Sequence, residues 1–375
     1  INFSTKVVNG SFLKNLNNNN GRINYDGQLE NISKYKFSKI KNFYENNPEI
    51  LLNENYIIFF ENKGSILKFD NENNLAWKKN YYLKREKKQN PILFFANNRN
   101  ILIVADNIAK FYGLDINTGD LLWSKVNSSP FNSQIKIHKD KFFIIDFENI
   151  LRAYSIANGK EIWNIKTKNS LIRSKKKLSI VIFDEKIYFN NTSGDISSVD
   201  INTGELIWQI PTQSTVNYVA GDFLQTSDII VDKESLYFSN NKNQFFSIDR
   251  KTGTLNWIQE INSKLRPTLI SNYLLTVSKK GYLIILEKNT GKIIRVNNIF
   301  NKFKPREKSG IEPTGFIVGK DNVYLTTTHG RLLEIEIKNG ETKRTIKIDN
   351  KKISRPLILN QDLYITTDNS IIKLN

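Results

Sequence analysis

The chain has 375 residues, and its 55 Lys and Arg residues outnumber 37 Asp and Glu residues, so its formal net charge is +18. It contains no Cys, which excludes disulfides, a thiol nucleophile and thiolate metal sites. No apolar run approaches the roughly 18 residues that a membrane-spanning helix needs. The basic excess fits either solvated loops of an Asn- and Lys-rich chain or attraction to an acidic partner, a lipid surface or a polyanion.

The chain opens with an Asn-rich stretch, and we predict that residues 1–21 form a flexible leader. Residues 22–375 are predicted to form a single domain, because one pattern repeats along them. The stretch DINTGDLLW at 115–123 returns as DINTGELIW at 200–208, and related copies flank both. Successive turn glycines are 38 to 49 residues apart, which indicates a solenoid or a propeller.

The tryptophans mark the repeat. All five stand at the same place after the turn, namely Trp77, Trp123, Trp163, Trp208 and Trp257, whereas two later copies carry Arg295 and Arg344 there. A large ring at a fixed place in an outer strand can pack between neighbouring repeats. We therefore interpret the tryptophans as structural contacts rather than ligand contacts, and we expect looser contacts where arginine stands.

Each repeat consists of short runs rich in Ile, Val, Tyr and Phe, which are separated by Gly, Asn and Asp. Such runs predict strands that are joined by tight hairpins, and no stretch shows the pattern of a capped amphipathic helix. Four antiparallel strands per repeat describe a propeller blade. Eight strand pairs can be counted, so the predicted fold class is all-β, an eight-bladed β-propeller of four-stranded antiparallel blades. The last copy ends at Asn375 one strand short, and residues 22–40 are predicted to supply that strand and close the propeller.

Candidate catalytic groups are scarce. The two histidines, His138 and His329, lie in different repeats without a second ligand nearby, and no nucleophile or phosphate-binding motif is present. The aspartates that begin the DINTG-type turns are explained by capping of the turn backbone, and the glycines by positive φ. We therefore predict no catalytic, cofactor-binding or metal site.

Basic clusters occur at Lys84–Lys88, Lys175–Lys177 and Lys302–Lys308, between the predicted blades. No aromatic-interleaved RNA motif or DNA-reading helix accompanies them, so nucleic-acid binding is not predicted.

The repeat resembles the pyrroloquinoline-quinone (PQQ)-type β-propeller family, whose signature is A-x-D-x-x-T-G-x-x-x-W. Gly113–Trp123, Ser198–Trp208 and Ser247–Trp257 match it except at the small first residue. Enzymes and scaffolds share this signature, so it indicates the fold more strongly than the function.

Within that family, the size, the single eight-bladed ring and the shortened last blade resemble the outer-membrane protein assembly factors, from about Arg22 onward. The resemblance implies a non-enzymatic scaffold without cofactor, located in the periplasm at the inner face of the outer membrane. It implies docking onto the periplasmic POTRA domains of BamA and assistance to the insertion of β-barrel proteins, whose unfolded strands are a second expected partner. A lipid anchor on a cysteine ahead of Ile1 is implied as well.

A quinoprotein dehydrogenase is the alternative. Those relatives are usually longer, and many carry an adjacent-cysteine disulfide that this chain cannot form. They also hold a calcium or similar ion with Glu, Asn and Asp, and no such cluster is recognisable in this sequence.

The resemblance carries over partner-binding loops in part. The family's Leu-x-Leu-Arg loop corresponds to Ser170-Leu171-Ile172-Arg173, where Ser170 departs from the pattern. Its Asp-x-Asp in the next loop corresponds to Asp222 and Asp228, which are six positions apart. An apolar side chain beside a guanidinium is typical of binding hot spots. The predicted partner-binding residues are Leu171, Ile172, Arg173, Asp222 and Asp228.

Overall fold

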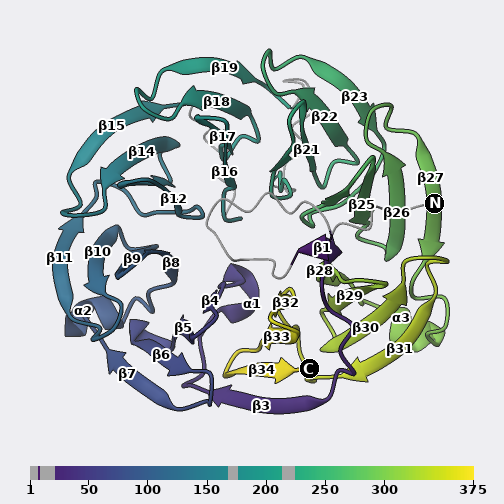
Figure 1. The fold of residues 1–375 in the computed structure, drawn as a ribbon, viewed down its shortest axis with the longest axis horizontal. Coiled ribbons are helices and arrows are strands. Elements are labelled where there is room, and N and C mark those ends of the chain that lie inside the picture. Colours follow the sequence, from purple (N-terminus) through teal and green to yellow (C-terminus); the bar gives the residue numbers. More distant parts are fainter. Residues whose placement is uncertain (1–6, 9–21, 168–175, 213–223) are drawn as a thin grey trace. The chain divides into compact units, whose positions relative to one another are not determined.

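The structure is a computed structural model that describes residues 7–8, 22–167, 176–212 and 224–375 (Figure 1). Within the described residues, the strands gather in eight four-stranded antiparallel sheets and one short two-stranded parallel pair. The eight sheets are the blades of a β-propeller, so the predicted fold class is confirmed. The chain divides into two compact units that contain four sheets each. Whether residues 22–375 act as one domain stays a prediction, and the predicted leader, residues 1–21, lies outside the described residues apart from Val7–Val8.

The first unit comprises residues 38–225. Its four sheets, in chain order, are β4 (Leu51–Asn53), β5 (Tyr56–Phe60), β6 (Ile66–Asp70) and β7 (Leu75–Lys79); β8 (Leu93–Asn98), β9 (Ile101–Asp106), β10 (Lys110–Asp115) and β11 (Leu121–Val126); β12 (Lys136–His138), β13 (Lys141–Ile145), β14 (Ile150–Ser155) and β15 (Glu161–Lys166); and β16 (Ile180–Phe183), β17 (Lys186–Asn190), β18 (Ile196–Asp200) and β19 (Leu206–Ile210). In each sheet the strands follow chain order from one edge to the other.

The second unit comprises residues 226–375 together with the N-terminal segment up to Phe37. Its sheets are β20 (Ile230–Val231), β21 (Ser235–Ser239), β22 (Phe245–Asp249) and β23 (Leu255–Gln259); β24 (Thr268–Ile270), β25 (Tyr273–Val277), β26 (Tyr282–Glu287) and β27 (Ile293–Asn298); β28 (Pro313–Val318), β29 (Asn322–Thr327), β30 (Arg331–Glu336) and β31 (Thr342–Lys347); and β32 (Leu357–Leu359), β33 (Asp362–Thr366) and β34 (Ser370–Leu374) with β3 (Asn31–Lys36). The parallel pair is β1 (Val7–Val8) with β2 (Arg22–Ile23).

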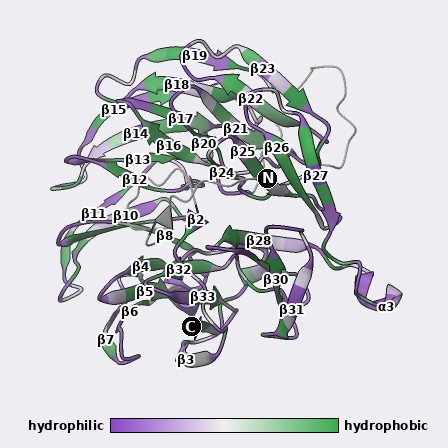
Figure 2. Cartoon of the chain, turned by 45° about the vertical axis from the view of Figure 1, so that its right-hand side comes forward, coloured by the Kyte–Doolittle hydropathy of each residue, from purple (hydrophilic) through white to green (hydrophobic). Residues whose placement is uncertain are grey.

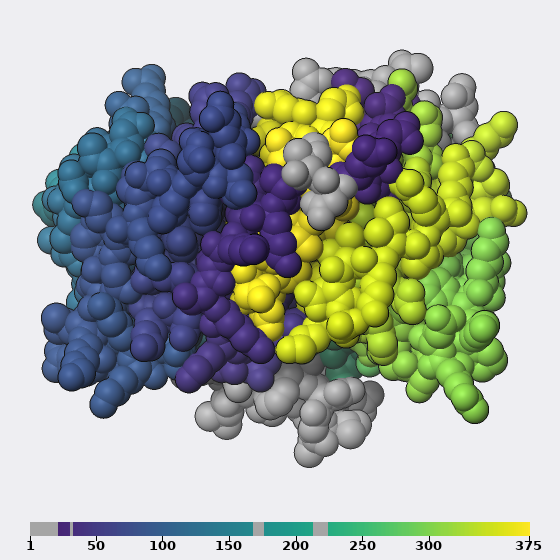
Figure 3. Space-filling view, turned by 90° about the horizontal axis from the view of Figure 1, so that it is seen from below, coloured from purple at the N-terminus to yellow at the C-terminus, as the bar shows by residue number. Residues whose placement is uncertain are grey.

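The last sheet is completed by the N-terminal strand. β3 pairs antiparallel with β34, with Lys34 opposite Ile372. The Leu29 amide donates to the Asn375 carbonyl at 2.5 Å, and the Asn375 amide donates to the Glu30 carbonyl at 3.1 Å. In Figure 3 the purple N-terminal residues lie directly against the yellow C-terminal ones. The predicted closure by residues 22–40 is therefore confirmed, and β3 is the strand that makes it.

Inner and outer strands of a sheet differ in how they are buried. β13 is buried at four of its five residues, because Phe142 and Ile144 pack in a cluster with β8–β11, and Phe143 and Ile145 pack in a cluster with β16–β19. This double burial explains why such strands are continuous apolar runs rather than alternating ones. In the outer strand β11, in contrast, Trp123 is half-buried and the other five residues are exposed.

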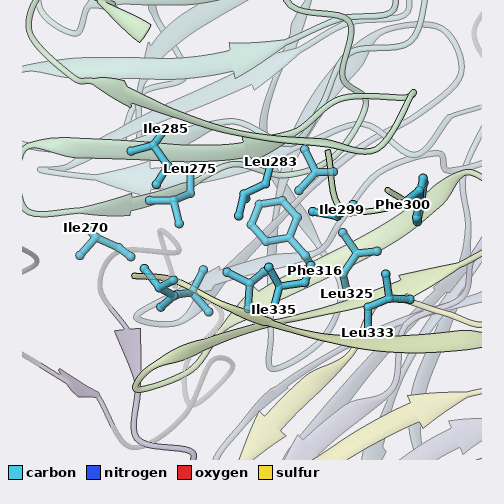
Figure 4. Close-up of a cluster of buried hydrophobic side chains, with 14 of the residues drawn as sticks. Ile270, Leu275, Leu283, Ile285, Ile299, Phe300, Phe316, Leu325, Leu333 and Ile335 are labelled. Atoms are coloured by element: carbon cyan, nitrogen blue, oxygen red, sulfur yellow. The ribbon is translucent and has the colours of Figure 1, made fainter. Parts of the chain in front are cut away.

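The hydrophobic cores lie between consecutive sheets. One cluster, drawn in Figure 4, joins β24–β27 to β28–β31 and contains Ile270, Leu275, Leu283, Ile285, Ile299, Phe300, Phe316, Leu325, Leu333 and Ile335 among others. These side chains are at least nine-tenths buried. Further clusters of buried apolar side chains join consecutive sheets within each unit, so stability comes from a series of similar interfaces rather than from one central core.

Four short helical turns occur in the connections, namely α1 (Phe43–Asn46), η1 (Asn62–Gly64), α2 (Lys84–Lys87) and α3 (Pro305–Lys308). None is long and apolar enough to span a membrane, and the described residues contain no other helix. In Figure 2 the strands carry most of the hydrophobic colour, whereas α3 is mostly hydrophilic. The last two turns fall on two of the basic clusters seen in the sequence.

Candidate partner-binding loops and the tryptophan contacts

The turn between the third and fourth strands of a sheet is built by the DINTG-type motif. The Asp115 carboxylate accepts from the Asn117 and Thr118 amides at 2.8 and 3.0 Å, and Gly119 has φ +75°. Asp200 and Asp249 accept the same two bonds in their own turns. The pKa of each carboxyl is lowered chiefly by the bond from a threonine amide, that of Thr203 or Thr252. The predicted capping and positive φ are confirmed, so these carboxylates are used by the turns.

Four of the five tryptophans join their sheet to that turn in the next sheet. Trp123 on β11 donates from Nε1 to the Ile156 carbonyl at 3.0 Å, and its ring covers Gly159 so closely that an added Cβ would lie 2.5 Å from a ring carbon. Three more tryptophan rings cover the next turn glycine in the same way: Trp77 on Gly119, Trp163 on Gly204 and Trp257 on Gly291. The indole of Trp77 donates to Ile116 and that of Trp257 to Lys288. Contacts of this kind link neighbouring sheets, and the purely structural role of the tryptophans stays a prediction.

A small residue, Gly113, Ala153, Ser198 or Ser247, stands opposite the tryptophan in four of the five copies, whereas Lys68 stands opposite Trp77. Gly113 pairs with Trp123 across the hairpin, and a Cβ on Gly113 would lie 2.5 Å from the indole nitrogen. Larger residues also stand opposite the two arginines. Ile285 stands opposite Arg295, and Glu334 stands opposite Arg344.

The arginine slots keep a contact with the next structural element. The Arg295 guanidinium donates to the carbonyls of Ile337 and Lys338, the same part of the turn that the indoles reach. Arg344 donates to the Gln28 carbonyl at 2.5 Å and pairs with Glu334 at 3.3 Å. Arginine therefore supplies the hydrogen-bond donor that the indole supplies elsewhere, but it has no ring to cover a turn glycine. Whether these contacts are looser stays a prediction.

A second repeated turn escaped the sequence analysis. Asp106, Asp146, Asn191 and Asn240 each accept from the amides two and four residues later, and each stands nine positions before the residue that begins the DINTG-type turn. That constant spacing was the signal that could have revealed them.

The surroundings of two of these carboxylates differ. Asp106 is fully buried and accepts from the Tyr82 hydroxyl at 2.5 Å, and burial raises its pKa to about 6. Asp146 is equally buried but pairs with Arg152 at 3.2 Å. The two carboxylates thus differ in their partners, since Asp106 accepts from a hydroxyl group and Asp146 pairs with a guanidinium group.

The predicted partner-binding residues fall mostly outside the described residues. Leu171, Ile172 and Arg173 lie in the segment 168–175, and Asp222 lies in the segment 213–223, neither of which the structure describes. Asp228 is described and half-buried just ahead of β20, and its carbonyl accepts from the Ser227 hydroxyl at 3.1 Å. The structure thus positions one of the five residues.

The residues directly before the two loops are well defined. Thr167, after β15, donates its hydroxyl to the Asn149 carbonyl at 3.1 Å. Thr212, after β19, donates to the Gly194 carbonyl at 2.8 Å. Asn149 and Gly194 occupy equivalent positions, each three residues into the second repeated turn, so the two loops begin at the same place in consecutive sheets.

No group of three or more His, Cys, Asp or Glu side chains suited to a metal ion occurs among the described residues. The sheets and the tryptophan contacts define the class of protein, an eight-bladed propeller of PQQ-like repeats. The family described as outer membrane protein assembly factor BamB matches residues 62–297, well over half of the chain. The chain belongs to the BamB family.

Individual relatives agree with this membership. The outer membrane protein assembly factor BamB of Shewanella oneidensis is 20% identical over 292 residues, which cover 70% of this chain and 69% of that protein. The crystal structure of BamB from Moraxella catarrhalis superposes with a TM-score of 0.74 at 16% identity, covering 92% of this chain and 99% of that one. The quinohemoprotein alcohol dehydrogenase of Comamonas testosteroni gives 0.73 at 10% identity, with 98% and 80% coverage. The two structural likenesses concern the fold alone.

Proposed function

We propose that this protein is a non-enzymatic scaffold of the machinery that assembles β-barrel proteins in the outer membrane, acting at the periplasmic face of that membrane. The observation that supports this proposal most strongly is the BamB family match over residues 62–297. The name of the Shewanella relative, an outer membrane protein assembly factor, points the same way.

The partner that we propose is the set of periplasmic POTRA domains of BamA. The binding residues are those of the loop 168–175, Leu171, Ile172 and Arg173, together with Asp222 and Asp228. The equivalent starting points of the two loops, at Thr167 and Thr212, support a pair of loops presented in the same way by consecutive sheets. An apolar anchor beside a guanidinium gives such a contact both buried area and directional hydrogen bonds.

A pull-down of purified POTRA domains, with wild type beside Arg173→Glu, tests this proposal. We expect the variant to bind roughly 30-fold more weakly or not at all, because a hot-spot arginine contributes about 2 kcal/mol or more. Arg306→Glu in α3 makes the same charge change at an exposed site and serves as the control. Undiminished binding by Arg173→Glu would contradict the loop assignment, and failure of the wild type to bind would contradict the scaffold proposal itself.

The alternative of a quinone-dependent dehydrogenase has only the shared fold in its favour. Titration of the tryptophan fluorescence with pyrroloquinoline quinone in the presence of Ca²⁺ separates the two. The scaffold proposal expects no saturable quenching, whereas tight saturable binding together with dye-linked substrate oxidation would favour the enzyme.

A further inference from the structure

The connection between β7 and β8 carries an apolar side chain among exposed cations. We call residues Leu83–Lys88, which contain α2, the basic turn. Leu83 is 57% exposed, the largest exposed fraction of any described large hydrophobic side chain except Val126. Lys84, Arg85 and Lys88 are exposed as well, and Lys87 is half-buried. Figure 1 shows α2 beside β10 in the first unit.

The basic turn is held in a defined conformation. The Leu83 amide donates to the Glu86 carboxylate at 2.7 Å, and the Lys87 amide donates to the Leu83 carbonyl at 3.0 Å. Lys110 at the start of β10 pairs with Glu86 at 3.4 Å and donates to the Tyr81 carbonyl at 2.7 Å. The next ring along, Tyr82, is buried. These contacts hold the basic turn against β10, so its exposed side chains are presented to solvent in a defined arrangement.

The positive charge of the basic turn is not offset locally. Its one carboxylate, Glu86, is already paired with Lys110, so the two charges cancel. Among the described residues, no carboxylate pairs with Lys84, Arg85, Lys87 or Lys88. Exposed Lys63 in η1 adds a further cation nearby, because its carbonyl accepts from Asn80, three residues before Leu83. The four cations of the basic turn and Lys63 thus surround one leucine without an offsetting carboxylate.

An apolar side chain surrounded by cations matches the interface of a membrane with anionic lipids. The cations meet lipid phosphates, and the apolar side chain enters the boundary between headgroups and acyl chains. Recognition of a nucleic acid would call for exposed aromatic rings on which bases stack. Neither neighbouring ring qualifies, because Tyr82 is buried and the Tyr81 hydroxyl donates to the Gly119 carbonyl. We propose that the basic turn docks on the surface of an anionic phospholipid membrane, with Leu83 as the inserted side chain.

The second unit offers a matched comparison. In α3, Arg306-Glu307-Lys308 repeats Arg85-Glu86-Lys87, and the Lys304 amide donates to the Glu307 carboxylate at 3.1 Å as the Leu83 amide does to Glu86. Lys304 stands where Leu83 stands in the basic turn. This turn has similar charge and geometry without the apolar side chain, which makes it an internal control.

Because the chain has no Cys, a single introduced cysteine can carry an environment-sensitive fluorophore. The fluorophore is attached to Leu83→Cys or, as the control, to Lys304→Cys. Each labelled full chain is mixed with anionic vesicles of phosphatidylglycerol and phosphatidylcholine, and separately with vesicles of phosphatidylcholine alone. We expect a blue shift at position 83 with the anionic vesicles only, and little or none at position 304. The absence of a shift at position 83, or equal shifts at both positions, would overturn the proposal.

Charge reversal gives a second readout by vesicle flotation. We expect Arg85→Glu with Lys88→Glu to weaken binding to the anionic vesicles roughly tenfold or more, because each cation near such a surface adds to the attraction. Lys304→Glu with Arg306→Glu changes the net charge equally and should leave binding within about threefold. Equal losses in both double variants would show that binding depends on the overall charge of +18 rather than on the basic turn. Binding to RNA or heparin without binding to vesicles would identify a different polyanion as the partner. Either result contradicts the proposal. Circular dichroism confirms that each variant is folded.

Discussion

At the scale of single residues, tight contacts between a side chain and a glycine recur along the chain. Gly159 combines φ +66° with the ring of Trp123 directly over its missing Cβ. Two separate penalties therefore oppose any side chain at this position, a backbone conformation that L-residues rarely adopt and a collision with the indole.

These two penalties can be separated. We predict that Gly159→Ala lowers the free energy of unfolding by about 2–4 kcal/mol, of which roughly 1 kcal/mol is backbone strain. In a Trp123→Ala background the collision is gone, so the same change should cost only about 1 kcal/mol. Urea denaturation of the four proteins measures this, and equal costs in both backgrounds would contradict the ring contact.

The buried Asp106 predicts a pH dependence. Its pKa is raised to about 6 in the folded protein, above the value of roughly 3.9 for an unfolded aspartate. The folded state therefore binds more protons between these values, and this group lowers stability as the pH rises from about 4 to about 6. Asn occupies the equivalent place at Asn191 and Asn240, so Asp106→Asn keeps the turn bonds. We predict that the variant matches wild type near pH 4 and exceeds it at pH 7 by at most about 3 kcal/mol.

Asp146→Asn is the control for that experiment, because its carboxylate pairs with the buried Arg152. Arg152 also pairs with Glu161 at 2.6 Å, so removing the Asp146 carboxylate takes away one of its two ion-pair partners, and we expect a loss of about 2 kcal/mol at pH 7. Thermal unfolding between pH 4 and pH 7 compares the two variants. A gain in stability by Asp146→Asn, or a loss by Asp106→Asn that grows with pH, would contradict these assignments.

At the scale of elements, the outer strand of each sheet supplies the contact to the next one. Trp257 on β23 is nine-tenths buried and gives both a ring and a hydrogen bond, whereas Arg295 on β27 is half-buried and gives hydrogen bonds only. Interfaces with the arginine contact therefore bury less apolar area at this position.

The two contacts predict different mutational costs. We expect Trp257→Ala to lower the free energy of unfolding by about 3–5 kcal/mol and Arg295→Ala by about 1–2 kcal/mol. Hydrogen exchange should report each loss locally, with faster exchange around residues 287–291 for the first variant and around residues 336–340 for the second. Similar costs for both variants would show that the arginine slot is as tight as the tryptophan slot.

Much at this scale could be predicted from the sequence, because the pattern is repeated. Strand pairs, turn aspartates and the missing last strand all follow from comparing one repeat with the next. The four-residue turn α2 could not be predicted, since its conformation depends on the bond from the Leu83 amide to Glu86 and on the contact of Glu86 with Lys110 on another strand. The partner loops departed from the family pattern at Ser170 and at the spacing of Asp222 from Asp228, so resemblance alone could not define their geometry.

At the scale of the whole molecule, the chain contains two compact units of four sheets, and β3 ties the N-terminal segment to the last sheet through β34. Repetition distributes stability over many similar interfaces, which leaves the loops between sheets free to vary. Membership of the BamB family, together with loops that start at equivalent places after β15 and β19, is the basis for the proposed scaffold.

The most direct test of that scaffold is hydrogen exchange of the full chain, measured by mass spectrometry with and without purified POTRA domains of BamA. We predict slower exchange in peptides that cover residues 168–175 and 213–228 when the POTRA domains are present, and unchanged exchange around α3. Unchanged exchange in both loops, or protection confined to other parts of the chain, would contradict the proposed binding site.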